Sequence, residues 1–294
     1  MTAAPAGRAL ITGAGGQVGL ALRERAPRGW VVIACDRGEL DVTVGDDVRR
    51  VIGSARPTLV IHAAAYTAVD AAESDPARAE AVNAGGTAHV VDAVRRAGAR
   101  LVHLSTDFVF DGSSGRPYAP NDHPAPLGVY GRTKLAAEQA ALGLGEGAVV
   151  VRTAWVYSRH GQNFVRTMLG LMREQDSVGV VSDQVGTPTW AWSLADALWA
   201  VAERPALHGV MHWTDAGVAS WYDFAVAIQE EALAAGLLDR AVPVRPLSSG
   251  EYPTAARRPA YSVLSKGESW TALGLTPPHW RVNLRRMLQE LTRG

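Results

Sequence analysis

A glycine cluster directly after the first apolar run constrains the fold of this chain more than any other feature. The apolar run covers residues 9–12, and a helical pattern begins at residue 17. Between them, Gly13, Gly16 and Gly19 have the spacing G-x-x-G-x-x-G, which is typical of loops that bind the pyrophosphate of a dinucleotide. The first glycine permits a sharp turn, the second lets the backbone approach the phosphates, and the third lets the helix pack closely on the strand.

Apolar runs and helical patterns alternate through the first half of the chain. The apolar runs cover residues 9–12, 31–35, 59–65, 101–105 and 149–152. The helical patterns cover residues 17–25, 48–55, 76–98 and 130–142. Continuous apolar strands that alternate with helices predict a parallel sheet with both faces covered, and such crossovers are right-handed. We therefore expect an α/β fold with a Rossmann-type doubly wound parallel sheet.

The pattern changes after about residue 155. Helical patterns now cover residues 163–174, 193–203, 221–235 and 281–291, with short strand patterns at 178–181 and 210–213 and a proline-rich stretch at 243–259. This pattern predicts a smaller C-terminal α/β domain that binds the substrate. We expect an NAD(P)-binding domain at residues 1–155, to which 183–205 returns, and a mainly substrate-binding domain at 156–294.

Composition restricts the possible partners and compartments. The 294 residues contain 29 basic and 29 acidic side chains, so charge gives no reason to expect nucleic acid or a membrane surface as partner. No apolar run approaches the roughly 20 residues of a membrane span, and residues 1–8 lack the apolar core of a signal peptide. The single cysteine, Cys35, cannot form an internal disulfide and is expected to be a buried small hydrophobe. These features predict a cytoplasmic protein.

An acidic residue ends the second apolar run, 20 residues past Gly16. A carboxylate at this position, Asp36, accepts hydrogen bonds from ribose hydroxyls and favours NAD. The neighbouring Arg37 can pair with the 2′-phosphate of NADP, or it is a solvated surface charge. We expect Asp41 and Val42 to flank the adenine, and we expect both NADH and NADPH to be used.

Three small side chains, Ala63, Ala64 and Ala65, end the third apolar run. Small side chains at the end of this strand leave room for the cofactor. Plain core packing accounts for Ala63 better than for the other two.

Tyr130 and Lys134 form a Y-x-x-x-K pattern within a predicted helix. Residues four apart share one helix face, so the ammonium can lie beside the phenol. A phenol has a pKa of about 10 in water, and a nearby positive charge lowers that pKa toward the range of acid–base catalysis. We therefore expect both residues to be catalytic.

The fourth apolar run ends in Thr106 and Asp107, at the edge of the sheet where doubly wound folds bind their ligands. A hydroxyl there can hydrogen-bond a substrate carbonyl beside the tyrosine; the alternative is a hydroxyl that caps the strand. We expect Thr106 to be catalytic and Asp107 to contact the substrate.

With these motifs in place, the chain resembles the dTDP-4-dehydrorhamnose reductase family of the extended short-chain dehydrogenase/reductase superfamily, nearly from end to end. The glycine loop and the Y-x-x-x-K pattern are common to the superfamily, and the other segments are more specific. The matching segments are 15–19, 63–70, 105–110, 129–134, 152–157, 183–189 and 248–259. They also place Gln17, Val18 and Tyr66 at the cofactor.

The resemblance implies reduction of the C4 ketone of dTDP-4-dehydro-L-rhamnose to dTDP-L-rhamnose. Tyr130 would protonate the carbonyl oxygen, Lys134 would hold the nicotinamide ribose, and Thr106 would orient the carbonyl. Trp155 matches a substrate-contacting tryptophan, with a core aromatic as the alternative. Arg258 would meet the substrate pyrophosphate, with a surface arginine as the alternative.

One departure from the family concerns metal. Some members dimerise through a magnesium ion held by glutamates, and the matching positions here are Ala21 and Trp192. Neither side chain can ligate a hard cation, so no metal site is expected. We expect a monomer or a weak homodimer.

Two other functions stay open on sequence alone. One is a related dTDP-keto-sugar reductase, such as a dTDP-dihydrostreptose synthase. The other is a non-catalytic nucleotide-binding regulatory subunit, because the regulatory β subunit of methionine adenosyltransferase resembles the same family. The intact Thr106, Tyr130 and Lys134 argue against a regulatory subunit. Dehydratases of the superfamily carry an Asp-Glu pair after the threonine, where this chain has Asp107-Phe108, so simple reduction is favoured.

Overall fold

The structure is a computed structural model that describes residues 7–292. Its first half is built on a six-stranded parallel sheet. The stretch read as lacking a signal peptide therefore lies almost wholly outside the described residues. The strand order is β10-β5-β4-β3-β1-β2, and all neighbours are parallel. The strands are β1 (Gly7–Thr12), β2 (Trp30–Cys35), β3 (Leu59–His62), β4 (Arg100–Thr106), β5 (Ala148–Thr153) and β10 (Gly209–His212).

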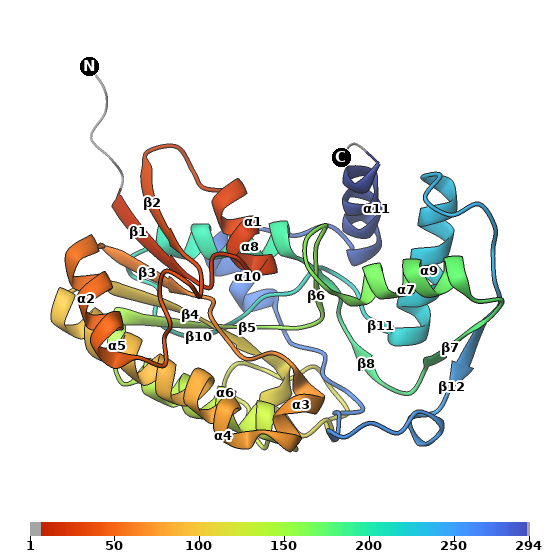
Figure 1. The fold of residues 1–294 in the computed structure, drawn as a ribbon, viewed down its shortest axis with the longest axis horizontal. Helices are drawn as coiled ribbons and strands as arrows, with labels where there is room; N and C mark the ends of the chain where they lie inside the picture. The colour runs from red at the N-terminus through yellow and green to blue at the C-terminus, as the bar shows by residue number, and fades with distance from the viewer. Residues whose placement is uncertain (1–6, 293–294) are drawn as a thin grey trace.

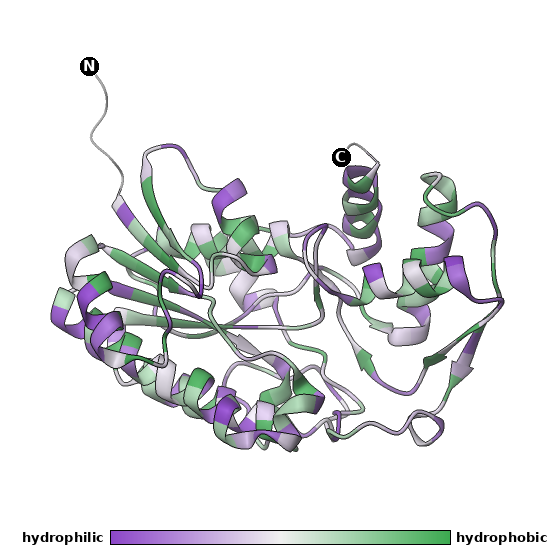
Figure 2. Cartoon of the chain, viewed as in Figure 1, coloured by the Kyte–Doolittle hydropathy of each residue, from purple (hydrophilic) through white to green (hydrophobic). Residues whose placement is uncertain are grey.

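Helices cover both faces of this sheet (Figure 1). On one side lie α1 (Gln17–Glu24), α8 (Ala191–Ala202) and α10 (Gly267–Leu273); on the other lie α2 (Gly45–Ala55), α5 (Gly86–Ala97) and α6 (Val129–Leu142). Alternate strand residues enter two separate cores, so that Ile61 packs toward α1 and α8 while Val60 packs toward α2 and α5. Burial on both faces explains why the strands are almost continuously apolar (Figure 2). The predicted doubly wound fold is confirmed.

Strand β10 departs from the division expected from the sequence, which places residues 210–213 in the second domain. It pairs in parallel with β5, and Val210 lies opposite Val150. Helix α8 packs beside α1 and thus returns the chain to the sheet for a sixth parallel strand. The return of α8 agrees with the expectation for residues 183–205, and the two-domain division itself stays a prediction.

The second half packs three longer helices around its own apolar core (Figure 1). These are α7 (Phe164–Glu174), α9 (Trp221–Ala234) and α11 (Trp280–Leu291). The short strands pair as β6 (Val156–Tyr157) with β9 (Thr189–Trp190), β8 (Val185–Gly186) with β11 (Ala219–Ser220), and β7 (Val178–Val181) with β12 (Val244–Leu247). Two tryptophans, Trp190 and Trp280, are buried in this core.

Short helical turns connect these elements. They are α3 (Val69–Ser74), α4 (Pro76–Glu80), the π-helical turn η1 (Ala81–Gly85), and the 3₁₀ turns η2 (Asp107–Val109), η3 (Gly145–Gly147) and η4 (Ser249–Glu251). Cys35 is buried at the end of β2, as expected. Among residues 7–292, no helix combines the length and apolar character that crossing a membrane requires.

Candidate active site

The glycine loop has the geometry that its spacing predicts. Gly13 has a φ of 68°, and a Cβ there would lie 2.7 Å from the backbone of Ala64. A Cβ on Gly19 would lie 2.3 Å from the carbonyl oxygen of Gly13, so only glycine lets α1 approach the loop this closely. Gly16 is the N-cap of α1 and provides no capping side chain. The first N–H groups of α1 can therefore bind an anionic group.

A cavity of about 510 Å³ opens beside this loop. It brings together most of the predicted cofactor residues. Its lining includes Gly13, Gly16, Asp36, Arg37, Asp41, Val42, Ala63, Ala64, Ala65 and Tyr66. The small alanines leave this space open, and its size and position at the glycine loop fit the adenosine half of a dinucleotide.

Five predicted cofactor residues do not line the cavity. Two of them, Tyr130 and Lys134, belong to α6, and the other three lie at the start of α1. Gly19 and Val18 lie within α1, where Val18 packs into the core. Gln17 is turned toward the second half, because its Oε1 accepts hydrogen bonds from Ser158 and Asn163, each at 3.0 Å. Contacts of these three residues with a cofactor stay predictions.

Side chains of both charges line the cavity. Asp36 Oδ1 accepts hydrogen bonds from the backbone N–H groups of Gly38 (2.7 Å) and Glu39 (3.1 Å), which fixes the carboxylate at the end of β2. The Arg37 side chain is exposed. Arg78, which the sequence reasoning missed, also lines the cavity and lies over the ring of Tyr66. Two guanidinium groups and a carboxylate together suit a phosphorylated or an unphosphorylated ribose.

Tyr130 and Lys134 share helix α6, as predicted, but the expected effect of the lysine on the tyrosine is absent. Lys134 Nζ donates to the carbonyl oxygen of Leu104 at 2.7 Å. Burial raises the pKa of Tyr130 to about 12 and lowers the pKa of Lys134 to about 8. The expectation that Lys134 lowers the pKa of Tyr130 is therefore wrong for this structure, because burial dominates and the ammonium is directed to β4.

Thr106 links Tyr130 to Asp107. Its hydroxyl donates to Asp107 Oδ1 at 3.0 Å and lies within hydrogen-bonding reach of the Tyr130 hydroxyl. A threonine hydroxyl has one proton, so while Thr106 donates to Asp107 it can only accept from Tyr130. Burial and the nearby charge of Asp107 favour a neutral Tyr130, the form that donates a proton, while the hydrogen bond with Thr106 acts in the opposite direction on its pKa. Asp107 itself is only 2% exposed, and its role as a substrate contact stays a prediction.

The position of α6 depends on two residues that the sequence reasoning did not single out. A Cβ on Gly131 would lie 2.2 Å from the carbonyl oxygen of Phe108, so the glycine inside the Y-x-x-x-K motif lets the helix touch η2. At the start of α6, Glu73 Oε1 accepts a hydrogen bond from the N–H of Val129 at 2.7 Å. For Gly131, a glycine within a helical pattern was a signal available in the sequence. For Glu73, the neighbouring sequence contained no such signal.

Asn83 connects the cofactor side of the site to the catalytic helix. Its amide Nδ2 donates to the carbonyl oxygen of Tyr66 (3.1 Å) and to Thr133 Oγ1 (3.0 Å), and its Oδ1 accepts from the N–H of Tyr66 (2.8 Å). Asn83 lies in the π-helical turn η1, a geometry often found at functional sites.

The predicted substrate residues have distinct environments. Trp155 has a φ of 48°, which is rare for a bulky residue, and its ring stacks on Trp221 with centroids 3.5 Å apart. Strain of this kind is typical of functional positions. Arg258 forms a bidentate ion pair with Asp70, at 3.0 and 2.6 Å. Its charge is thus already paired, and contact with a pyrophosphate stays a prediction.

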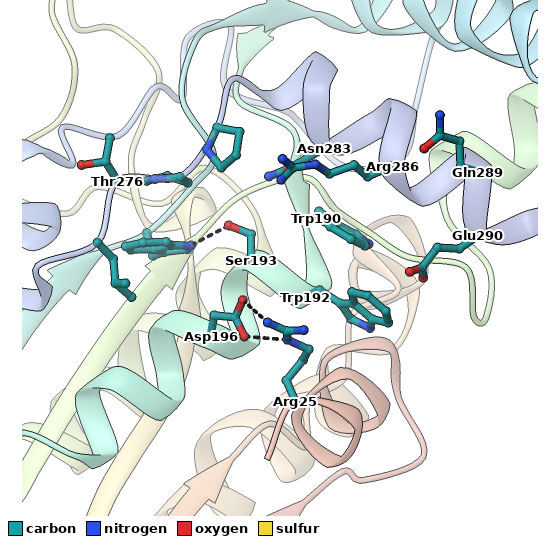
Figure 3. A pocket seen from close by; sticks show the side chains of 14 residues that line it. Arg25, Trp190, Trp192, Ser193, Asp196, Thr276, Asn283, Arg286, Gln289 and Glu290 are labelled. Carbon is teal, nitrogen blue, oxygen red and sulfur yellow. Dashed lines mark hydrogen bonds and ion pairs between the residues drawn. The ribbon is translucent and has the colours of Figure 1, made fainter. Parts of the chain in front are cut away.

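A second cavity, of about 450 Å³, lies between α1, α8 and α11 (Figure 3). Trp192 lines it, and its indole N–H donates to Glu24 Oε2 at 2.6 Å, while Ala21 is buried in α1. Arg25 and Asp196 form an ion pair across this region. Within residues 7–292, three or more metal-ligating side chains are nowhere grouped around a common point.

Comparison with known proteins adds the family to this geometry. Residues 7–293 match the family model described as the RmlD substrate binding domain. A dTDP-4-dehydrorhamnose reductase from Mycobacterium tuberculosis is 45% identical, over 96% of this chain and 92% of its own length. A probable dTDP-4,6-dihydroxy-2-methyloxan-3-one 4-ketoreductase from Streptomyces antibioticus is 44% identical, over 97% and 95%. The crystal structure of a dTDP-4-dehydrorhamnose reductase from Bacillus anthracis, in complex with NADP, matches with a TM-score of 0.90 at 36% identity, covering 97% of this chain and 99% of that chain.

Proposed function

Since the chain belongs to the RmlD substrate-binding-domain family, we propose that it reduces the C4 ketone of dTDP-4-dehydro-L-rhamnose with NADPH or NADH and releases dTDP-L-rhamnose. The observation that carries the proposal is the grouping of Thr106, Tyr130 and Lys134 at the end of β4, in the same half of the structure as a cavity that fits the adenosine half of a dinucleotide. Full-length similarity to reductases of this substrate supports the choice of sugar.

Each residue of the site has one task in this reaction. The glycine loop and the first turn of α1 hold the pyrophosphate, and Asp36 or Arg37 binds the adenosine ribose. The bound nicotinamide cofactor supplies the hydride. Lys134 holds the nicotinamide ribose, and Tyr130 donates its hydroxyl proton to the carbonyl oxygen. Burial keeps the phenol protonated, and the Thr106 hydroxyl beside it orients the carbonyl of the substrate.

The second candidate is a related dTDP-keto-sugar reductase, such as a dTDP-dihydrostreptose synthase. It is retained because the Streptomyces antibioticus ketoreductase is about as similar to this chain as the Mycobacterium tuberculosis reductase, at 44% against 45% identity. The regulatory-subunit alternative is dropped, because the curated relatives are named as reductases. Cytoplasmic location and a monomeric or weakly dimeric state stay predictions from the sequence.

The test couples purified protein to an upstream dehydratase and 3,5-epimerase that produce the keto sugar. We expect one reduced nicotinamide to be oxidised per sugar, followed by its absorbance, and NMR to identify dTDP-L-rhamnose. The upstream enzymes alone are the control. No oxidation above that control would reject this substrate, and a branched or 4-epimeric product would establish the second candidate.

A further inference from the structure

We propose that Glu138 is a positioning residue for the reduction: it holds the catalytic helix in register with β4 and places a carboxylate one helical turn from Lys134. The proposal rests on the function proposed above, because Lys134 acts there through its ammonium group. Glu138 lies one helical turn after Lys134 on α6 and is only 1% exposed. A carboxylate this deeply buried requires partners, since an unpaired buried charge is strongly unfavourable.

All hydrogen bonds to Glu138 come from the two strands under the catalytic helix. Its Oε1 accepts from Ser105 Oγ at 2.5 Å and from Arg152 Nε at 2.8 Å, and its Oε2 accepts from Arg152 Nη2 at 2.7 Å. Ser105 belongs to β4 and Arg152 to β5. Three bonds, two of them bidentate from one guanidinium, thus fix one turn of α6 to the carboxyl end of the sheet.

These bonds end next to the reacting groups. Ser105 is the residue directly before Thr106, and the residue before Ser105 is Leu104, whose carbonyl oxygen accepts from Lys134. Successive turns of α6 are therefore attached to successive residues of β4. A shift of the helix that breaks the Glu138 bonds also changes the separation of Tyr130 from Thr106.

Arg152 is anchored independently of Glu138. Its Nη1 donates to the carbonyl oxygen of Pro120 at 3.2 Å and lies 3.5 Å from Nε2 of His212, and its guanidinium lies over the ring of Phe110. His212 Nδ1 in turn lies 3.1 Å from the carbonyl oxygen of Ser265. Glu138 is thus held against a fixed cation, which a flexible surface pair would not provide.

The charge of Glu138 also acts on Lys134. The titratable groups that face Lys134 are Glu138 on α6, His62 on β3 and His103 on β4. Burial lowers the pKa of both histidines far enough to keep them neutral at pH 7. Glu138 is the one acid of the three, and its negative charge opposes the effect of burial on the pKa of Lys134.

The decisive variant is Glu138→Gln, which keeps the shape and an acceptor for Ser105 but removes the charge. We expect the basic limb of the kcat profile to move down by about one pH unit. Turnover at pH 8 should then fall about fivefold, since the pKa of Lys134 lies near 8, and should recover at pH 6. The affinity for NADPH, measured by fluorescence between pH 6 and 9, should also begin to fall at a lower pH than in the wild type. Glu138→Asp, which keeps the charge on a shorter arm, should lower kcat without moving the limb.

Two further variants separate positioning from stability. The double variant Glu138→Gln/Arg152→Met leaves no unpaired buried cation, so it replaces the single variant if that variant does not fold. The basic limb of its kcat profile should also lie at a lower pH than that of the wild type. Glu231→Gln is the matched control, because Glu231 is a buried carboxylate on α9 paired with Arg281 and Arg285. It should leave the limb unchanged.

A folded Glu138→Gln or double variant with an unmoved limb and unmoved pH dependence of NADPH binding would overturn the proposal. A limb that moves equally in Glu231→Gln would overturn it too, since the shift would then reflect general destabilisation. Wild-type protein that binds NADPH but turns over no keto sugar contradicts only the proposed function, and the binding profile still decides the role of Glu138.

Discussion

Tyr130 has the environment of an acid rather than of a base. Burial raises its pKa to about 12, and the charge of Asp107 acts in the same direction. A reductase needs a protonated donor at the start of each turnover, and this arrangement supplies one. The site is therefore set for proton donation to a carbonyl oxygen, the step that reduction requires.

Replacement of this phenol tests its role directly. Tyr130→Phe removes only the hydroxyl, so we expect kcat to fall by about 10²–10⁴ while NADPH affinity and the melting temperature stay near wild type. Steady-state kinetics and calorimetry measure these quantities. Tyr252→Phe, at an exposed tyrosine, is the control. Turnover within a factor of about three of wild type would remove Tyr130 from the mechanism.

The buried carboxyl group of Asp107 lowers the stability of the fold at neutral and alkaline pH. Burial raises its pKa from 3.8 to about 6. A carboxyl group whose pKa is higher in the folded than in the unfolded state favours folding below about pH 4, and this contribution is lost as pH rises through 6. Asp107→Asn should therefore be more stable than wild type at pH 8, by up to about 3 kcal/mol at 1.36 kcal/mol per pKa unit, and nearly equal at pH 4. Urea unfolding at both pH values measures this, and an equal difference at both would contradict the assigned cause.

The choice of cofactor depends on side chains at the end of β2. Asp36, Arg37 and Arg78 line the same cavity. A carboxylate there would favour NADH and a guanidinium would pair with a 2′-phosphate, so we expect kcat/KM values for NADH and NADPH within about a thousandfold, or roughly 4 kcal/mol. Arg37→Ala should weaken use of NADPH more than use of NADH. A larger preference in the wild type, or equal losses for both cofactors in the variant, would contradict this assignment.

Among single residues, the sequence predicts those whose contacts follow from residue type and local spacing alone. Gly13, Gly19 and the Tyr130–Lys134 pair are of this kind, because a turn or a helix alone brings their partners together. Asp70 is different, since its partner Arg258 is 188 residues away. Asn83 is different for the same reason, and only the folded chain shows what its amide holds.

Helix α6 is placed by a close backbone contact as well as by apolar packing. In an ordinary helix, Gly→Ala is favourable by about 1 kcal/mol, but at Gly131 the new Cβ would meet the carbonyl oxygen of Phe108 at 2.2 Å. Gly131→Ala should therefore lower stability by about 1–3 kcal/mol and kcat by tenfold or more, through displacement of Tyr130. Gly170→Ala in α7, where a Cβ meets nothing within 4 Å, is the control and should be neutral or slightly stabilising. Wild-type kinetics in Gly131→Ala would show that α6 tolerates the shift.

Elements were predictable where periodicity and burial agree. Strand β7 has the predicted bounds, and α7, α9 and α11 differ from prediction by one residue at an end. Strand β12 escaped notice because it lies in the proline-rich stretch and contains Pro246, which is tolerated because β12 pairs only with β7. Strand β10 was detected, but its pairing with β5 was not predicted, because sequence order does not reveal which edge of a sheet a late strand joins.

In the whole molecule, the sheet and the second half carry different parts of the site. The sheet, with an apolar core on each face, carries the glycine loop, Thr106 and the catalytic helix, and Trp155 packs against the core of the second half. The doubly wound architecture followed from the alternation of apolar runs and helices. The pairing of Arg258 with Asp70, which joins the two halves, did not, because long-range ion pairs leave no periodic trace in a sequence.

The surface around Trp192 determines what we expect of metal binding and assembly. An indole at this position donates to Glu24, and the neighbouring carboxylate of Asp196 is paired with Arg25. Hard cations require several oxygen ligands free to converge on one point, and Ala21 and Trp192 supply none. Treatment with EDTA should therefore change neither kcat nor the sedimentation coefficient, and added magnesium should leave a monomer or weak dimer as it was. Activity assays and analytical ultracentrifugation on the same dialysed sample test both halves of the statement. Loss of activity or dissociation on chelation, reversed by magnesium, would show that oxygen ligands from elsewhere in the chain bind the ion.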